Sequence, residues 1–215
     1  NLNGVMKNML SFVQVMTANP QMQNFEPVPA LLELLNEWSA EGVTTSSEFA
    51  LGAATNSPAD LDIMLEAAKN DSFKVRLRAY PSYIINEQWN KSGLKNNTGN
   101  DLAKVVGFKL FADGSNQGFT GLQRETYCCN ASHFGSHGKE YTTVEDLYQY
   151  ARERTEQGFQ LAIHGNGDQA IDNILEVLQR LKDEGYDISS LRPRIEHASI
   201  LHDEQIQKMK ELGVT

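Results

Sequence analysis

The sequence predicts an α/β protein with a parallel sheet, and three observations support this. Five short apolar or β-branched runs alternate with amphipathic helical patterns along the 215 residues. The spacing between most successive runs leaves room for the crossover that parallel strands need. The composition, with 40% hydrophobic and 22% charged residues, is typical of a chain that buries a core. Strands are expected at 43–49, 73–82, 102–111, 159–164 and 194–198.

The helices are predicted from apolar residues that recur every three or four positions. The first pattern begins at Val5 and ends at Asn19–Pro20, and the second spans 27–40 and stops before Gly42. Further helices are expected at 58–69 (capped by Asn56 or Ser57), 142–157 (capped by Thr142 or Thr143), 168–184 and 203–212. No internal linker is visible, so a single domain is predicted over 1–215.

Charge and composition exclude several classes of partner. The net charge is −9 and the 19 basic residues form no stripe, which argues against nucleic acid and anionic membranes. No apolar run approaches the roughly 20 residues of a membrane span. The adjacent Cys128 and Cys129 cannot build a disulfide framework. The first residues lack a basic signal-peptide region, so we expect a cytoplasmic location and a piece of a longer or processed chain.

Two histidines stand at the ends of two successive predicted strands. His164 and His197 each follow a short apolar run and precede a helical pattern. The carboxyl ends of parallel strands meet at one edge, where barrel enzymes build their sites, and two imidazoles delivered there suggest a metal. Each histidine taken singly is also compatible with a hydrogen-bonded core position.

Lys109 reaches the same edge from the strand at 102–111. An ammonium has no lone pair and ligates no metal, so three roles stay open. Lys109 is a Schiff-base nucleophile, or a carbamate that offers anionic oxygen to a metal, or a rim lysine paired with Asp113 or another acid.

The segment 113–141 is too long for an ordinary strand-to-helix connection and contains five glycines, so a functional role is expected. Asp113 and Ser115 either bind substrate or cap the loop. His133 and His137 are either solvated or contribute to binding a small-molecule substrate. Their spacing of four does not indicate a helical ligand pair, because glycine interrupts the segment.

Three neighbouring features have competing interpretations. Residues 165–170 match the dinucleotide fingerprint G-x-G-x-x-A, but Asp168 opposes a pyrophosphate at that helix start and is instead expected to cap the helix. Glu196 alternates with His197 and is expected on the opposite side of its strand, paired with a basic residue. His202 is expected to be exposed.

Three stretches, Phe108–Ser115, Ala162–Asp168 and Arg194–Ala198, together resemble the amidohydrolase superfamily and its YtcJ-like branch. Residues 42–45 and 75–79 look like the second and third barrel strands of that superfamily. The resemblance implies a partial TIM-type (β/α)8 barrel with about five parallel strands, lacking strands one, seven and eight.

The same resemblance implies a site and a reaction. Lys109, carboxylated, would bridge two metals, and His164 and His197 would be ligands. The cofactor would be one or two divalent ions, most simply zinc, and the reaction hydrolysis of an amide or related C–N bond. The His-x-His of strand one and the Asp of strand eight, the general base, have no counterpart here.

From that difference we expect weak metal binding, little hydrolysis by this chain alone, and self-association through open sheet edges. Two alternatives stay open. One is a non-catalytic binding or regulatory protein on the same barrel, and the other is a Schiff-base enzyme that uses Lys109.

Overall fold

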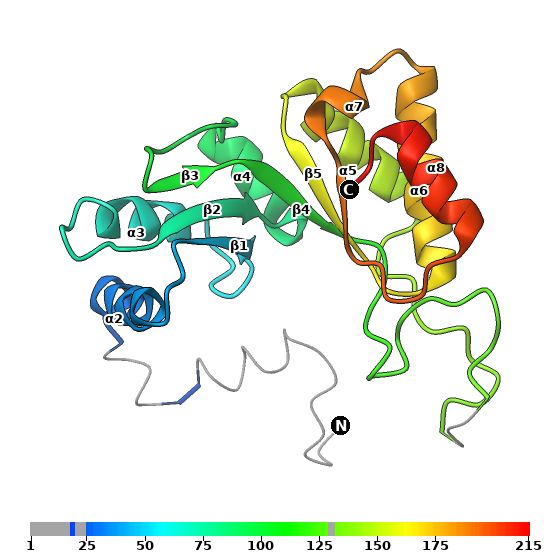
Figure 1. The fold of residues 1–215 in the computed structure, drawn as a ribbon, viewed down its shortest axis with the longest axis horizontal. Helices are drawn as coiled ribbons and strands as arrows, with labels where there is room; N and C mark the ends of the chain where they lie inside the picture. The colour runs from blue at the N-terminus through cyan, green and yellow to red at the C-terminus, as the bar shows by residue number, and fades with distance from the viewer. Residues whose placement is uncertain (1–17, 20–24, 129–131) are drawn as a thin grey trace. The chain divides into compact units, whose positions relative to one another are not determined.

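The computed structural model describes residues 18–19, 25–128 and 132–215 (Figure 1). The chain forms two compact units that divide between Val106 and Gly107, and each is described by itself. The prediction of one incomplete barrel domain over 1–215 stays a prediction.

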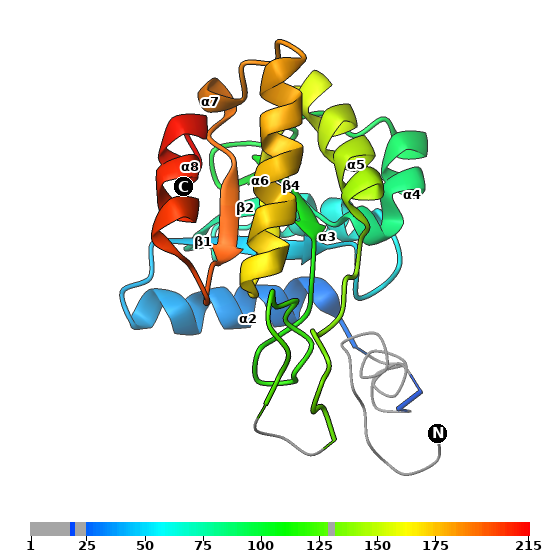
Figure 2. The same cartoon turned by 90° about the vertical axis from the view of Figure 1, so that its right-hand side faces the viewer.

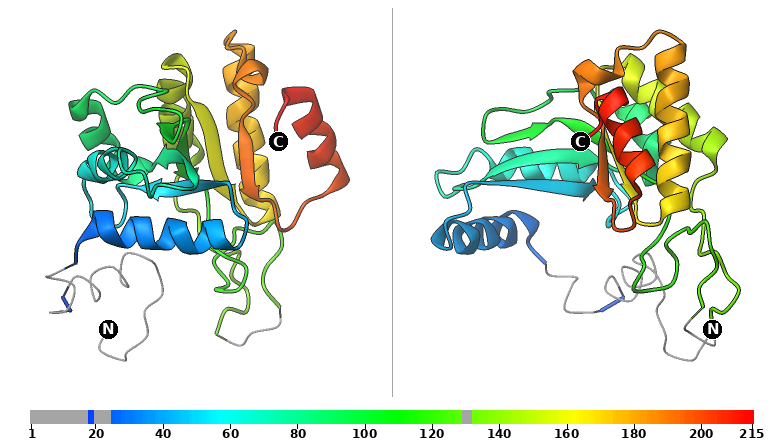
Figure 3. Two further views of the ribbon diagram at one scale, coloured as in Figure 1. Left: turned by 60° about the vertical axis from the view of Figure 1, so that its left-hand side comes forward. Right: turned by 45° about the vertical axis from the view of Figure 1, so that its right-hand side comes forward.

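The first unit is a parallel sheet with helical connections. Its sheet has the order β1-β2-β3, and α2 lies beneath β1 in both views of Figure 3 and packs against α3. The elements are α2 (Pro27–Ala40), β1 (Thr45–Leu51), α3 (Ala59–Ala67), β2 (Arg76–Pro81), the 3-10 helix η2 (Tyr83–Ile85), α4 (Asn86–Ser92) and β3 (Ala103–Val105).

The second unit holds the candidate site. Its parallel sheet has the order β4-β5-β6, and Figure 2 shows α6 flanked by α5 and α8. The elements are β4 (Gly107–Phe111), α5 (Val144–Glu156), β5 (Gln160–Gly165), α6 (Asp168–Asp183), α7 (Ile188–Leu191), β6 (Arg194–His197) and α8 (Asp203–Leu212). At the outer edge of β6, Thr215 donates to Pro193 O (2.9 Å) and accepts from Ile195 N (3.0 Å).

Strand alternation gives this sheet one apolar and one polar face. The apolar face packs against the helices and consists of Phe108, Leu110, Leu161, Ile163 and Ile195, all buried. Burial of each such side chain contributes about 1.5–3 kcal/mol. The opposite face carries Lys109, Phe111, His164, Arg194 and Glu196, because parallel neighbours in register point to the same side. Packing of the apolar face against the helices therefore leaves the polar and ionisable side chains together on the opposite face.

Most predicted elements are confirmed, with shifted ends. The single strand expected at 102–111 is wrong: it divides at Val106 into β3 and β4, which belong to different sheets. A continuous apolar run contains no signal for such a break. The short η2, α4 and α7 were not predicted, and the helix expected from Val5 lies outside the described residues.

The predicted helix caps are partly right. Thr143 caps α5 by accepting from Asp146 N at 3.1 Å. Pro58 rather than Asn56 or Ser57 precedes α3, although Ser57 Oγ accepts from Ala59 N (3.2 Å). Within the described ranges, no helix has the length and apolarity to cross a membrane.

Candidate metal centre

The candidate site lies at the carboxyl ends of β4, β5 and β6. The register pairs His164 with Phe111 on one side and with Glu196 on the other. Lys109, two residues before Phe111, therefore shares the face of His164. The expectation that Glu196 points away from this face is wrong. Glu196 does pair with a base, since Arg194 Nε lies 2.6 Å from Glu196 Oε1.

His164 and His197 are in ring contact. Their centroids lie 4.5 Å apart with the planes 72° from parallel. His197 is in register with Gly165, so the strand pleat alone would direct it away from His164. The backbone instead turns left-handed at His197 (φ 76°) and Ala198 (φ 44°). This conformation costs non-glycine residues of order 1 kcal/mol and is concentrated at functional sites.

Backbone hydrogen bonds hold this turn in place. Ala198 N donates to Gly165 O (3.0 Å) and Ile200 N donates to Asn166 O (3.1 Å). The end of β6 is thereby fixed against the end of β5, where His164 lies.

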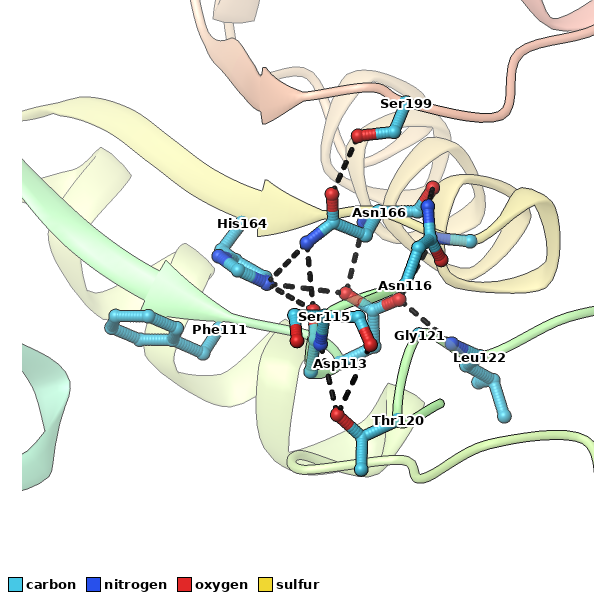
Figure 4. Close-up of polar contacts among 12 residues, drawn as sticks. Phe111, Asp113, Ser115, Asn116, Thr120, Gly121, Leu122, His164, Asn166 and Ser199 are labelled. Atoms are coloured by element: carbon cyan, nitrogen blue, oxygen red, sulfur yellow. Dashed lines mark hydrogen bonds and ion pairs between the residues drawn. The ribbon is translucent and has the colours of Figure 1, made fainter. Parts of the chain in front are cut away.

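His164 is held as a neutral imidazole of one tautomer. Its Nε2 lies 2.6 Å from Gly114 O, and Figure 4 shows the ring beside Asn166. A carbonyl oxygen has no proton to donate, so Nε2 carries the hydrogen and Nδ1 keeps a lone pair. Burial lowers the pKa of His164 to about 4, although the bond to Gly114 acts in the opposite direction. A neutral ring with one free lone pair is the form that ligates metals.

Lys109 is a buried amine with a perturbed pKa. Its side chain is only 3% exposed, and burial lowers its pKa to about 8, while the charge of Glu196 partly offsets this. Its Nζ lies 5.0 Å from the ring centroid of Phe111. A lowered pKa increases the fraction of free amine, the form that attacks carbon dioxide or a carbonyl. Lys109 is thus buried, and which of its three predicted roles it fills stays a prediction.

Asp113 lies beneath the rim and organises the backbone around it. The carboxylate is fully buried; Oδ1 accepts from Asn166 N (2.9 Å), and Oδ2 from Gly167 N (2.9 Å) and Leu122 N (2.8 Å). Burial raises the pKa of Asp113, against these three hydrogen bonds. One carboxylate therefore joins the long loop to the start of α6, and its contact with substrate stays a prediction.

The other three predicted substrate residues make their described contacts within the loop. Ser115 Oγ accepts from Gly118 N (3.1 Å), His133 stacks on Phe119 (5.0 Å, 9°), and His137 Nδ1 lies 3.1 Å from Gln123 O. None of these contacts reaches His164 or His197, so the proposed role of these residues in binding substrate stays a prediction.

The glycines of the dinucleotide-like motif serve packing. A Cβ on Gly167 would lie 1.9 Å from Leu122 O, and one on Gly165 would lie 2.6 Å from Ile174 Cδ1. The N–H of Gly167, which a pyrophosphate would need, is bound by Asp113. The dinucleotide interpretation therefore fails. Asp168 is the first residue of α6 and not its cap.

The sequence analysis missed an arginine that anchors the long loop. Arg124 Nε and Nη2 both donate to Asp172 at 2.7 Å, and Nη1 donates to Glu204 at 2.8 Å. Its backbone N–H donates to Asp168 Oδ1 (2.8 Å), and His202 Nε2 lies 3.1 Å from Asp168 Oδ2. No periodic signal surrounds Arg124 in the sequence, so only the fold identifies this clamp.

The donor set fits part of a divalent-metal site. His164 and His197 are two imidazoles in ring contact that could each offer a nitrogen, and Lys109 would offer an anionic oxygen only if it were carboxylated. Among the residues described, no cluster of three or more His, Cys, Asp or Glu side chains forms a complete site. A four-coordinate ion would therefore need further ligands.

Comparisons with known proteins agree with this geometry. The model of the amidohydrolase family matches residues 3–215, and the chain belongs to that family. It is 27% identical over 106 residues to the putative amidohydrolase YtcJ of Bacillus subtilis (strain 168), covering 49% of this chain and 19% of that protein. The predicted resemblance to the amidohydrolase superfamily is confirmed.

Two solved structures show the same fold. One is an uncharacterized metal-dependent hydrolase from Pyrococcus horikoshii OT3, with a TM-score of 0.72, 24% identity and coverage of 87% of this chain and 35% of that chain. The other, from Pyrococcus furiosus, has a TM-score of 0.76, 21% identity and coverage of 95% and 40%. This chain thus spans less than half the length of these relatives. The α/β class with parallel strands is confirmed and is consistent with a partial TIM-type barrel.

Proposed function

We propose that the protein is a metal-dependent hydrolase that cleaves amide or related C–N bonds of a small molecule. Membership of the amidohydrolase family supports the hydrolase class. The observation that carries the proposal is the contact between His164 and His197 at strand ends, on the sheet that also buries Lys109. Polar groups assembled at this end of a parallel sheet are typical of catalytic sites.

His164, His197 and carboxylated Lys109 would hold one or two divalent ions, for which we propose zinc. Imidazole nitrogen and anionic oxygen both suit zinc at tetrahedral sites. When bound, such an ion supplies Lewis-acid chemistry that polarises a carbonyl and lowers the pKa of water to about 7.

Lys109 is prepared for carboxylation by its surroundings. Burial favours the neutral amine. The amine lone pair forms an N–C bond with carbon dioxide while one C=O π bond opens onto its oxygen, and one N–H proton passes to water, which leaves a carbamate anion. Glu196 holds Arg194 on the same face, and both charges act on Lys109. The charged residues of this face would thus determine the electrostatic potential at the proposed metal site.

Metal binding by variants tests the proposal. Zinc retained after equilibrium dialysis is measured by mass spectrometry for the wild type, His164→Ala, His197→Ala and Lys109→Met. We expect each variant to bind at least tenfold more weakly. His137→Ala is the control, because His137 contacts Gln123 in the loop. Equal zinc binding by all variants contradicts the proposal.

The buried amine of Lys109 also favours a second candidate, a Schiff-base enzyme. Two labelling experiments distinguish the candidates. Borohydride with a small carbonyl compound would add mass irreversibly at Lys109 in a Schiff-base enzyme. Carbon-13 bicarbonate would instead give a carbamate signal in the wild type that Lys109→Met lacks, as the hydrolase proposal predicts.

A further inference from the structure

Asn166 lies between the ends of three consecutive strands. It follows β5 by one residue and is only 7% exposed. Its side chain bonds to Gly114, beyond the end of β4. Figure 4 shows the side-chain oxygen directed toward Ser199, beyond the end of β6. Its side chain therefore hydrogen-bonds to the segments that follow both neighbouring strands, close to His164 and His197.

The amide nitrogen of Asn166 acts on His164 through a carbonyl. Nδ2 donates to Gly114 O at 2.7 Å, and the same oxygen accepts the Nε2–H of His164 at 2.6 Å. Nδ2 and Nε2 lie 3.1 Å apart. Two donors therefore converge on one oxygen, and the bond from Asn166 restrains the carbonyl to which the His164 ring is hydrogen-bonded.

The amide oxygen of Asn166 acts on the segment after His197. Ser199 Oγ donates to Oδ1 at 2.6 Å, and Ser199 stands two residues after His197. The backbone of Asn166 adds a second tie, because its oxygen accepts from Ile200 N (3.1 Å). These bonds secure the left-handed turn that brings His197 to His164.

We propose that Asn166 is the positioning residue that holds the His164 and His197 rings in register with each other, acting through Gly114 O and Ser199 Oγ. Its value for metal binding rests on the proposed function, whereas its effect on the two rings does not. Outer partners that orient metal-ligating histidines typically change metal affinity 10- to 100-fold.

The two hydrogen bonds of the Asn166 side chain require an amide group. Asn166 must donate to a carbonyl and accept from a hydroxyl with a single planar group, which an amide does and a carboxylate does not. In Asn166→Asp an acceptor oxygen would face Gly114 O, and the repulsion would displace the carbonyl from His164. Asn166→Ala removes both bonds without adding repulsion.

Proton exchange at the His164 ring tests the proposal without metal. In protein labelled with nitrogen-15 histidine, we expect the Nε2–H of His164 to be visible by NMR and protected from exchange. Asn166→Ala should exchange this proton at least tenfold faster. Ser199→Ala should have a smaller effect, and the double variant should exchange no faster than Asn166→Ala, because Ser199 acts through Asn166.

The matched control is Gln123→Ala. Gln123 is also a buried amide, but it bonds to Asn116 and Tyr127 within the loop. We expect its removal to leave the His164 proton protected. If Asn166→Ala does not fold, Ser199→Ala is sufficient: faster exchange of the His164 proton supports the proposal, and unchanged exchange overturns it. Three results would overturn the proposal. The first is that neither Ser199→Ala nor Asn166→Ala changes the exchange rate of the His164 proton. The others are that Gln123→Ala accelerates this exchange as much as Asn166→Ala does, or that the wild-type ring carries its proton on Nδ1.

Zinc titration separates this proposal from the proposed function. If both hold, Asn166→Ala raises the apparent Kd for Zn²⁺ 10- to 100-fold and Gln123→Ala does not. If the exchange result holds but even the wild type binds no zinc through His164, the positioning role stands and the metal site falls. If zinc binds through His164 but exchange is the same in every variant, the positioning role falls alone.

Discussion

The carboxylate of Asp113 accepts the backbone N–H of Gly167 at 2.9 Å, across 54 residues of sequence. The same carboxylate accepts from Asn166 and from Leu122. The long loop after β4 and the turn after β5, which begins at Asn166 two residues beyond His164, therefore share one anchor. The geometry of the candidate metal centre depends on this buried anion.

We predict that Asp113→Asn destabilises the protein. An amide nitrogen in place of either oxygen would face backbone N–H groups and leave them unsatisfied, which costs about 1–3 kcal/mol. Urea denaturation measures the change. Asp183→Asn is the control, since Asp183 is exposed and bonds only to Gln179 among its described contacts, and its effect should stay within about 0.5 kcal/mol. Equal effects of the two variants would refute the anchoring role.

We predict that Gly167→Ala destabilises through a steric clash. The added Cβ would lie 1.9 Å from Leu122 O, although the φ of −87° at Gly167 suits any residue. Overpacking of this kind costs about 1–3 kcal/mol, and we expect the upper part of that range. Gly158→Ala is the comparison, because Gly158 has open space but φ +77° and should lose about 1 kcal/mol. A smaller loss at Gly167 than at Gly158 would contradict the prediction.

We predict an alkaline rise in stability from Lys109 in the presence of chelator. Its pKa is lowered from 10.5 to about 8 in the folded protein, so between these pH values the unfolded chain binds more protons. The free energy of unfolding contributed by Lys109 therefore rises with pH across this window and is lowest below pH 8. The penalty there is about 3 kcal/mol.

Urea denaturation from pH 7 to 10.5 checks this prediction. Lys109→Met should remove the rise attributed to Lys109 and stabilise the protein at pH 7. Lys91→Met, with a side chain 78% exposed, should follow the wild-type profile. A parallel profile for wild type and Lys109→Met would show that the amine is not desolvated.

We predict that the chain self-associates. In the parts that the structure describes, β1 pairs with a named strand, β2, on one side only, and such an edge pairs readily with other strands. Light scattering at micromolar concentration should give a mass well above the 24.0 kDa of one chain. A mass equal to one chain at all concentrations would rule this out.

The sequence was sufficient for most of the longer elements and for the placement of three candidate residues on neighbouring strands. Their positions on successive strands singled out Lys109, His164 and His197 as candidates, because alternating strands and helices dictate where parallel strands end; their role as ligands stays a prediction. The break at Val106 was not predictable, since apolar residues continue through it. The face of Glu196 was misjudged because His197 leaves the strand pleat through a left-handed backbone, so it is a poor reference for its neighbour.

The tertiary partners of the site were beyond the sequence. The proposed role of Asn166 depends on its hydrogen bonds to Gly114 and Ser199, and these bonds depend on the register of three strands. Arg124 anchors the long loop by hydrogen bonds to Asp172 and Glu204, which lie 48 and 80 residues away in the sequence. Such pairings arise from packing between distant segments, and neither periodicity nor motif spacing encodes them.

The most direct test of the metal-hydrolase proposal is titration with Zn²⁺ followed by nitrogen-15 NMR of the five histidines. We predict that Nδ1 of His164 and one ring nitrogen of His197 shift together, while His133, His137 and His202 keep their resonances. Shifts confined to the other three histidines, or no shift at any histidine, would contradict a metal centre at the ends of β5 and β6.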